Sequence, residues 1–242
     1  MQLIADISTS LSLLAFSPPG WGGALLKGLL SSLQIALGGY GLGLLIGIAG
    51  ACGKLYGNAV CRDLLGCYTT AVRAVPELVL ILLLYYAGSD LVNQVLHWLS
   101  YPPIDINGLV AGIFVIGIVQ GAYSTEVIRG AMSAIPVGHI EAAFACGMRP
   151  WQVLKRIILP EMLVHALPGL SNLWLIATKD TALLAVVGFT ELTLITKQAA
   201  GGTKHHMLFY CAAGLLYLSV TLISNWGIKK LDNHLRHTKA ST

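Results

Sequence analysis

Residues 108–128 read GLVAGIFVIGIVQGAYSTEVI, an apolar stretch in which the acidic Glu126 comes only near the end. The hydrocarbon core of a bilayer requires about 20 predominantly apolar residues in a helix. The stretch therefore predicts a membrane-spanning helix. The 27 glycines of the chain fit this interpretation, because glycine is common in membrane helices and lets them approach closely.

Four further stretches have a similar length and apolar character: residues 24–51, 64–88, 163–188 and 207–228. We therefore expect an all-α fold, a polytopic membrane helix bundle of about five transmembrane helices. The fourth stretch contains Pro168, Asn172, Lys179 and Asp180. Because polar groups at membrane depth need protein or water around them, this span is expected to be broken or to line a cavity.

The composition supports a membrane protein. Of the 242 residues, 55% are hydrophobic and 11% are charged, against roughly 25% charged in an ordinary soluble domain. The net charge of +4 is too small and too scattered to predict a nucleic-acid partner. The five cysteines match no zinc or redox spacing, and no metal site or cofactor is expected in this chain.

The basic residues predict the orientation, because loops on the cytoplasmic side carry an excess of Lys and Arg. One side of the five-span arrangement collects Lys54, Arg62, Arg129, Arg149, Lys155, Arg156, Lys229, Lys230, Arg236 and Lys239. The other side has Lys197 and Lys204, with Lys27 near the start of the first span. We expect the N-terminus outside the cell and the C-terminus in the cytoplasm.

This orientation gives three parts: an outer N-terminal segment (1–23), a transmembrane domain (24–231) and a cytoplasmic tail (232–242). Residues 1–20 end at Pro18-Pro19-Gly20 and are expected to form a surface helix or a loose tail. A separate outer helix is predicted around residues 91–99, whose apolar residues share one face before Pro102-Pro103.

The loop between the third and fourth spans, residues 131–162, contains the most informative pattern. A short helix is expected from about Pro136 to Gly147, because glycine commonly follows a helix end. A second, amphipathic helix is expected to begin near Arg149-Pro150, since proline suits the first helical turn. Pro160 is expected to close the segment before the fourth span.

Glu141-Ala142-Ala143, three residues, Gly147, nine residues and then Ile157-x-Leu159-Pro160 make a long-spaced pattern. It resembles the EAA loop of the permeases of bacterial ABC importers. The resemblance implies a coupling helix that docks on a cytoplasmic ATPase homodimer, and a location in the bacterial inner membrane. The ATPase-coupling residues it implies are His139, Glu141, Ala142, Ala143, Gly147 and Arg149. The chain has no G-x-x-x-x-G-K-[ST] sequence, so ATP and Mg are expected in the partner ATPase, and this chain is not expected to be an enzyme.

More of the chain, from about residue 25 to 231, resembles the permeases for polar and especially basic amino acids, such as histidine, arginine, lysine, ornithine or opines. The segments that carry this resemblance are 72–80, 121–131, 134–143, 165–169 and 179–183. The resemblance implies a second permease subunit, a non-identical homologue, and a periplasmic amino-acid-binding protein. It also implies transport by alternating access.

Charged residues in the spans need a reason, because a buried charge is costly unless it is paired or hydrated. Arg73 and Glu77 are four residues apart, and Glu126 and Arg129 are three apart, so each pair is predicted to form within one helix. Structural ion pairs account for these residues without any role in transport. Alternatively, some polar residues line the substrate path, and the candidates are Glu77, Glu126, Lys179, Asp180 and Thr181.

Three alternatives stay open. A permease for another small solute, such as methionine, a metal or an osmolyte, would share the EAA loop. An ion-coupled secondary transporter would use intramembrane charges, but would not need the spacing from Glu141 to Pro160. A membrane scaffold without transport activity would not explain Lys179-Asp180 in a span.

Overall fold

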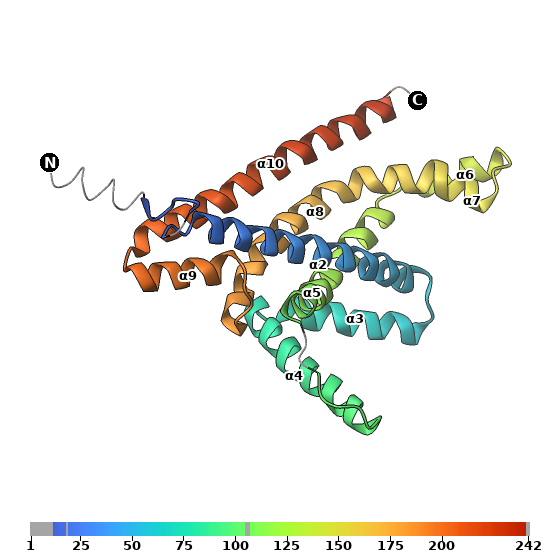
Figure 1. The fold of residues 1–242 in the computed structure, drawn as a ribbon. Helices are drawn as coiled ribbons and strands as arrows, with labels where there is room; N and C mark the ends of the chain where they lie inside the picture. The colour runs from blue at the N-terminus through green and yellow to red at the C-terminus, as the bar shows by residue number, and fades with distance from the viewer. Residues whose placement is uncertain (1–11, 18, 105–106, 241–242) are drawn as a thin grey trace. The chain divides into compact units, whose positions relative to one another are not determined.

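The structure is a computed structural model that describes residues 12–17, 19–104 and 107–240. All regular secondary structure in these ranges is helical (Figure 1). The elements are α2 (Gly22–Tyr56), α3 (Ala59–Ala74), α4 (Glu77–Trp98), α5 (Gly108–Ser133), α6 (Val137–Ala145), α7 (Pro150–Val153), the π-helical η1 (Leu154–Ile158), α8 (Leu159–Asp180), the 3₁₀-helical η2 (Thr181–Val187), α9 (Leu192–Thr203) and α10 (His206–Ala240).

Five helical segments are long and apolar enough to cross a membrane: Gly22–Tyr56, Glu77–Trp98, Gly108–Ser133, Pro150–Val187 and His206–Asn233. Large apolar side chains lie exposed on them, among them Leu45 and Leu222. Such side chains would be unfavourable in water and suit contact with lipid. The prediction of an all-α bundle with five spans is confirmed, whereas the orientation stays a prediction.

The predicted second span, 64–88, is wrong in its boundaries. Helix α3 ends at Ala74, and α4 begins at Glu77. Pro76 lacks an N–H and disfavours a helical conformation in the residue before it, and Val75 is extended, with φ −99° and ψ 137°. Arg73 and Glu77 therefore belong to different helices, so the prediction that they pair within one helix is wrong.

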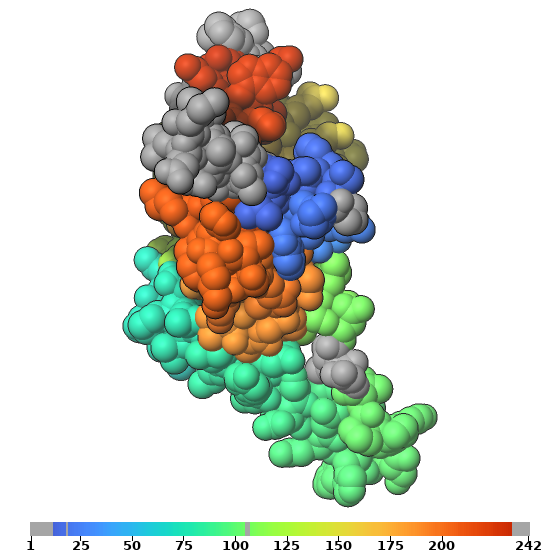
Figure 2. Space-filling view, turned by 60° about the vertical axis from the view of Figure 1, so that its left-hand side comes forward, coloured from blue at the N-terminus to red at the C-terminus, as the bar shows by residue number. Residues whose placement is uncertain are grey.

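The separate outer helix predicted around residues 91–99 is also wrong, because α4 continues without interruption to Trp98. No proline or glycine lies between Ser89 and Trp98 to end it, and the apolar pattern simply extends the span. Figure 2 shows the end of α4 projecting beyond η2 and α9. Trp98 is 92% exposed there.

Pro160 does not close a segment, which corrects another expectation. The helical path runs from Pro150 through η1 into α8, and Pro160 is the second residue of α8. In η1 the Leu159 N–H donates to the Leu154 carbonyl, one residue further back than in an α-helix. Pro160 has no N–H to donate, and it directly follows the π-helical segment, where the α-helical hydrogen-bond pattern is already interrupted. The predicted break is present instead at Asp180, where α8 gives way to the tighter η2.

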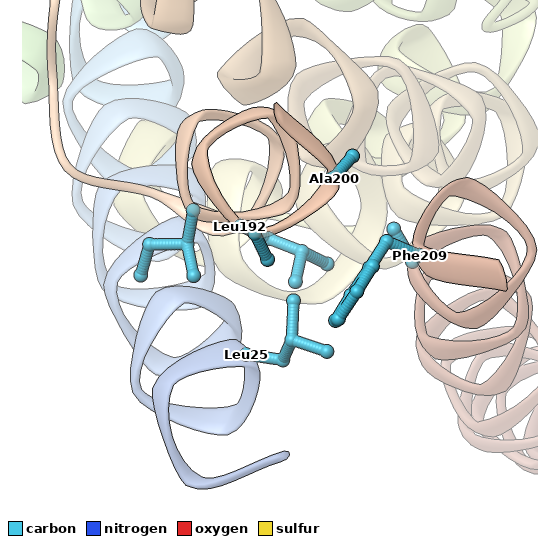
Figure 3. Close-up of a cluster of buried hydrophobic side chains, with 7 residues drawn as sticks. Leu25, Leu192, Ala200 and Phe209 are labelled. Carbon is cyan, nitrogen blue, oxygen red and sulfur yellow. The ribbon is translucent and has the colours of Figure 1, made fainter. Parts of the chain in front are cut away.

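The chain divides into two compact units, each described here by itself. Unit 1 comprises residues 1–39, 77–116 and 177–223. Its core joins the start of α2, α9 and the start of α10, with Leu25, Leu192, Ala200 and Phe209 packed together (Figure 3). Phe209 and Leu192 are fully buried, so α9 is firmly held in this unit.

Unit 2 comprises residues 40–76, 117–176 and 224–242. Its packing depends on a close approach of α2 to α5. A Cβ added at Gly43 would lie 2.8 Å from the Gln120 Cβ, and one added at Gly47 would lie 2.5 Å from the Ser124 Cβ. Glycine lets these two helices touch at the backbone, as small residues commonly do in membrane bundles.

The three-part division predicted above stays a prediction, and residues 1–11 and 18 of the predicted N-terminal segment lie outside the described residues.

Candidate functional site

Helix α6 and α7 form a hairpin, residues 137–153, that precedes α8 in unit 2 (Figure 1). Gly147 adopts φ +76°, a left-handed conformation that favours glycine. The Gly147 N–H donates to the Phe144 carbonyl at 2.9 Å, and the Met148 N–H donates to the Ala143 carbonyl at 3.1 Å. These two bonds make a Schellman motif, which ends α6 sharply. The predicted helix, the break at Gly147 and the second helix are all confirmed.

The second arm of the hairpin begins with a hydrogen bond between the backbone and a side chain three residues later. Arg149 occupies the N-cap position of α7, and its backbone N–H donates to the Gln152 Oε1 at 2.8 Å. Pro150 is the first helical residue, where its missing N–H is no loss. Val153 is 1% exposed and fixes this arm to the unit. Trp151 is 69% exposed, so the apolar face predicted for this arm lies largely on the surface.

The residues predicted to contact an ATPase do not all share one surface. The structure exposes five of the six: His139, Glu141, Ala142, Gly147 and Arg149. Ala143 is 5% exposed and is the buried residue of α6, so it does not share the surface of the other five. The exposed surface of α6 therefore combines the carboxylate of Glu141 and the small side chain of Ala142 with the exposed ring of Phe144.

One side-chain contact joins the hairpin to the following membrane helix. His139 Nδ1 lies 2.9 Å from the Glu161 Oε2, and Glu161 is the third residue of α8. The Glu161 side chain is 10% exposed and that of His139 is 54% exposed. His139 is part of the pattern that predicts the coupling helix, whereas Glu161 is not, because its only local signal is an acidic residue at the start of an apolar run.

Glu126 belongs to an ion cluster of unit 2. Its carboxylate accepts hydrogen bonds from the Lys54 Nζ at 2.5 Å and from the Arg129 Nη2 at 2.9 Å. Lys54 also donates to the Thr69 hydroxyl. The predicted pair of Glu126 and Arg129 is confirmed. The cluster ties α2, α3 and α5 together, which gives Glu126 a structural role. Its assignment to the substrate path stays a prediction.

The other path candidates lie in unit 1. Lys179 and Asp180 are the last residues of α8, and Lys179 is exposed while Asp180 is half-buried. Thr181 is fully buried and donates to the Thr178 carbonyl at 2.8 Å, a bond that supports the change from α8 to η2. Glu77 is half-buried at the first position of α4.

Glu191 is a buried carboxylate that the sequence analysis did not consider. It is 0% exposed and caps α9, with the Leu194 N–H 2.7 Å from Oε1 and the Thr193 N–H 2.8 Å from Oε2. The hydroxyls of Ser32 on α2 and Tyr217 on α10 also donate to Oε2, each at 3.2 Å. Burial raises the pKa of Glu191 above its ordinary value, although these four donors partly oppose the shift. An acidic residue directly before the apolar run of α9 is the signal that could have identified it.

Comparison with known proteins establishes what kind of chain this is. Residues 39–237 match the family of binding-protein-dependent transport system inner membrane components. The chain belongs to this family. As a member it is an inner-membrane transport permease subunit of an ABC system and not an enzyme, and such a component operates with an ATPase and a binding protein.

Two curated relatives cover most of this permease. The histidine/lysine/arginine/ornithine transport system permease protein HisQ of Escherichia coli (strain K12) is 40% identical over 206 residues, which are 85% of this chain and 90% of HisQ. The nopaline transport system permease protein NocQ of Agrobacterium fabrum is 39% identical over 228 residues, which are 92% of this chain and 95% of NocQ.

Solved structures share the fold of the permease. An amino acid ABC transporter crystallised with histidines matches with a TM-score of 0.75 and 24% identity, covering 88% of this chain and 95% of that one. The inward-facing methionine ABC transporter MetNI matches with a TM-score of 0.72 and 18% identity, covering 90% of this chain and 99% of that one. At these identities the likeness concerns the fold alone.

Proposed function

We propose that this permease forms the membrane path of an ATP-driven importer for polar, chiefly basic, amino acids. The substrate class is supported by relatives whose names specify histidine, lysine, arginine, ornithine, nopaline and octopine transport. The observation that carries the mechanism is the exposed α6–α7 hairpin, with Glu141 and Ala142 at its surface and Gly147 fixing its turn.

In this mechanism the hairpin lies in the cytoplasm and docks on the ATPase. The ATPase is a homodimer that binds ATP and Mg. Its closure presses on α6, and the membrane helices reorient so that the path opens first outward and then inward. Glu141, Ala142 and Arg149 form the contact surface, whereas Ala143 and Gly147 keep the hairpin compact. The permease supplies the path and the moving element, and the ATPase supplies the free energy.

The excess of Lys and Arg in alternate loops supports an orientation with the N-terminus in the periplasm and the C-terminus in the cytoplasm. Cys146 offers a direct test, because it is exposed next to the turn of the hairpin. A membrane-impermeant thiol reagent added to intact cells should leave Cys146 unmodified, and should modify it in inverted membranes. Modification of Cys146 by reagent added to intact cells would contradict this orientation and favour the opposite one.

A second permease subunit is supported by the surface of unit 1. Lys179 is exposed at the end of an apolar helix, where contact of an ammonium group with lipid would be costly by several kcal/mol. A water-filled path or a second subunit must therefore cover it. We propose that the second subunit is a non-identical homologue, and that the path between the two subunits includes Lys179, Asp180, Thr181 and Glu77.

The proposal is tested with the complete importer in proteoliposomes, together with its binding protein. Ala142→Trp should prevent docking and Gly147→Asp should distort the turn, so both should abolish arginine or histidine uptake and release the ATPase during purification. Ala59→Trp changes an exposed alanine of the same unit outside the hairpin and is the matched control. Normal uptake by both hairpin variants would refute the docking role. Uptake of methionine but not of basic amino acids would refute the substrate class.

A further inference from the structure

We propose that the contact of His139 with Glu161 makes the α6–α7 hairpin and the base of α8 one rigid body, and that this link transmits the movement of α6 to the membrane helix. The inference rests on the proposed docking of α6 on an ATPase. It assigns Glu161 as a positioning residue that acts through His139, away from any contact with ATPase or substrate.

The first argument concerns how the hairpin is held. Its turn is closed by the Schellman bonds at Gly147, and α6 packs against α7 and η1. His139 lies in the first turn of α6, and Ala143 is the buried residue of that helix. The bond from His139 to Glu161 closes the end opposite the turn across a sequence separation of 22 residues. The hairpin and the start of α8 thereby form a closed loop.

The second argument concerns the alternative path for a force. Apart from this contact, α6 packs against α7 and η1 and is joined to them by the glycine turn, and these short elements in turn lead into α8. Each is short or irregular, and a π-helical segment within an α-helix often marks a place where the helix adjusts. The contact of His139 with Glu161 bypasses all three, since it joins α6 directly to the third residue of α8.

The third argument concerns the chemistry of the pair. An ionised carboxylate only accepts hydrogen bonds, so the hydrogen between the two atoms belongs to His139 Nδ1. Glu161 is 9% exposed, and a hydrogen bond that is shielded from water is stronger than the same bond on an open surface. The pair is therefore held together during movement, while the exposed side of His139 leaves room for a partner.

The test uses the complete importer with its ATPase, second permease and binding protein in proteoliposomes. Two quantities are measured: the ATPase retained on purification, and the amino acid taken up per ATP hydrolysed. Glu161→Ala and His139→Ala should retain the ATPase but lower the uptake per ATP by about 2- to 30-fold, the usual range for residues that carry coupling between sites. The double variant should be no worse than either single variant, because both remove the same bond.

Conservative variants separate transmission from simple loss of structure. His139→Asn places an amide N–H near the position of Nδ1, and Glu161→Gln keeps a carbonyl acceptor, so both should restore the wild-type ratio. Asp63→Ala and His205→Ala, at exposed positions outside the hairpin, are the matched controls and should not change it.

A normal ratio in His139→Ala and Glu161→Ala would overturn the inference, as would a ratio in His139→Asn as low as that of His139→Ala. Loss of the ATPase in Glu161→Ala would overturn it too, because the contact would then position the docking surface only. Failure of the docking role itself looks different: Ala142→Trp would then keep both its ATPase and its uptake.

Discussion

Removal of the Glu191 carboxylate should destabilise unit 1 by an amount that its hydrogen bonds predict. Glu191→Ala deletes the cap of α9, which costs about 1 kcal/mol in a typical helix. It also leaves the buried hydroxyls of Ser32 and Tyr217 without their acceptor, at about 1–3 kcal/mol for each unsatisfied group. Tyr217 retains the Thr193 hydroxyl as a partner at 3.3 Å, so we expect a total of about 3–5 kcal/mol. Thermal unfolding of the purified permease in detergent measures this loss.

The pH dependence of the same residue has a defined sign. Because burial raises the pKa of Glu191, the folded protein holds the proton more tightly than the unfolded chain does. Its contribution to stability is therefore complete below the pKa of the unfolded chain, about 4.3, and is lost as the pH rises through the raised pKa of the folded state. Tyr217 is the titratable side chain bonded to it.

Glu191→Gln isolates this effect. The amide keeps one carbonyl acceptor for the cap and cannot ionise, and all other titrating groups are the same in both proteins. The unfolding temperature of the wild type, minus that of Glu191→Gln, should fall as the pH is raised from about 4 to 8. Parallel curves over this range would show that the carboxylate titrates as it does in water. A loss below about 1 kcal/mol in Glu191→Ala would refute the hydrogen-bond reasoning itself.

Three further predictions concern unit 2. Gly47→Ala should destabilise the permease by about 1–3 kcal/mol in thermal unfolding, because the added Cβ would meet the Ser124 Cβ at 2.5 Å and its backbone carbon at 3.0 Å. Gly41→Ala on the same helix, with nothing within 4 Å, should be harmless, and equal effects would contradict the close packing. Lys54→Met should cost about 1–3 kcal/mol in the same assay, below the 3–5 of a fully buried pair because Arg129 still neutralises Glu126; an unchanged unfolding temperature would contradict the ion cluster. Gly147→Ala should cost about 1–2 kcal/mol locally, from its positive φ, and should speed protease cleavage of the turn, whereas Gly147→Asn should be tolerated. Equal cleavage rates for both variants would contradict the left-handed turn.

The fold was predictable where one physical rule acts over many residues. Membrane thickness sets the length of a span, so the five apolar runs were found although their ends shifted by several residues. The hairpin was predictable because Gly147 and Pro150 each act on the backbone locally. Pro76 and Pro160 show the limit of local rules. Both are prolines after apolar residues, yet Pro76 separates two helices and Pro160 lies inside a continuous helical path. The difference depends on the π-helical segment η1 before Pro160, for which the sequence has no recognisable signal.

Two of the contacts that the sequence did not predict join residues far apart in the chain. Glu191 accepts from Ser32, 159 residues away, and Lys54 reaches Glu126, 72 residues away. No periodicity or motif encodes such separations. Glu161 was missed for a different reason: its partner His139 was noticed only as part of a surface. The sequence thus identifies polar residues in spans that need an explanation, but tertiary contacts decide what the explanation is.

These contacts separate the charged residues that are held by several hydrogen bonds from those that lie at a helix end. Glu126 and Glu191 are each held by several donors from their own unit, and moving either of them to meet a substrate would break bonds that hold three helices together. A residue that binds and releases a substrate in every cycle must exchange partners at low cost, so a fully committed carboxylate is a poor candidate. Lys179 and Asp180 lie where α8 gives way to η2, and Lys179 is exposed to whatever covers this surface. A helix end can change its conformation with the loss of few backbone bonds. Both sites place charged residues in apolar spans, but substrate contacts are expected at the end of α8 and not in the ion cluster.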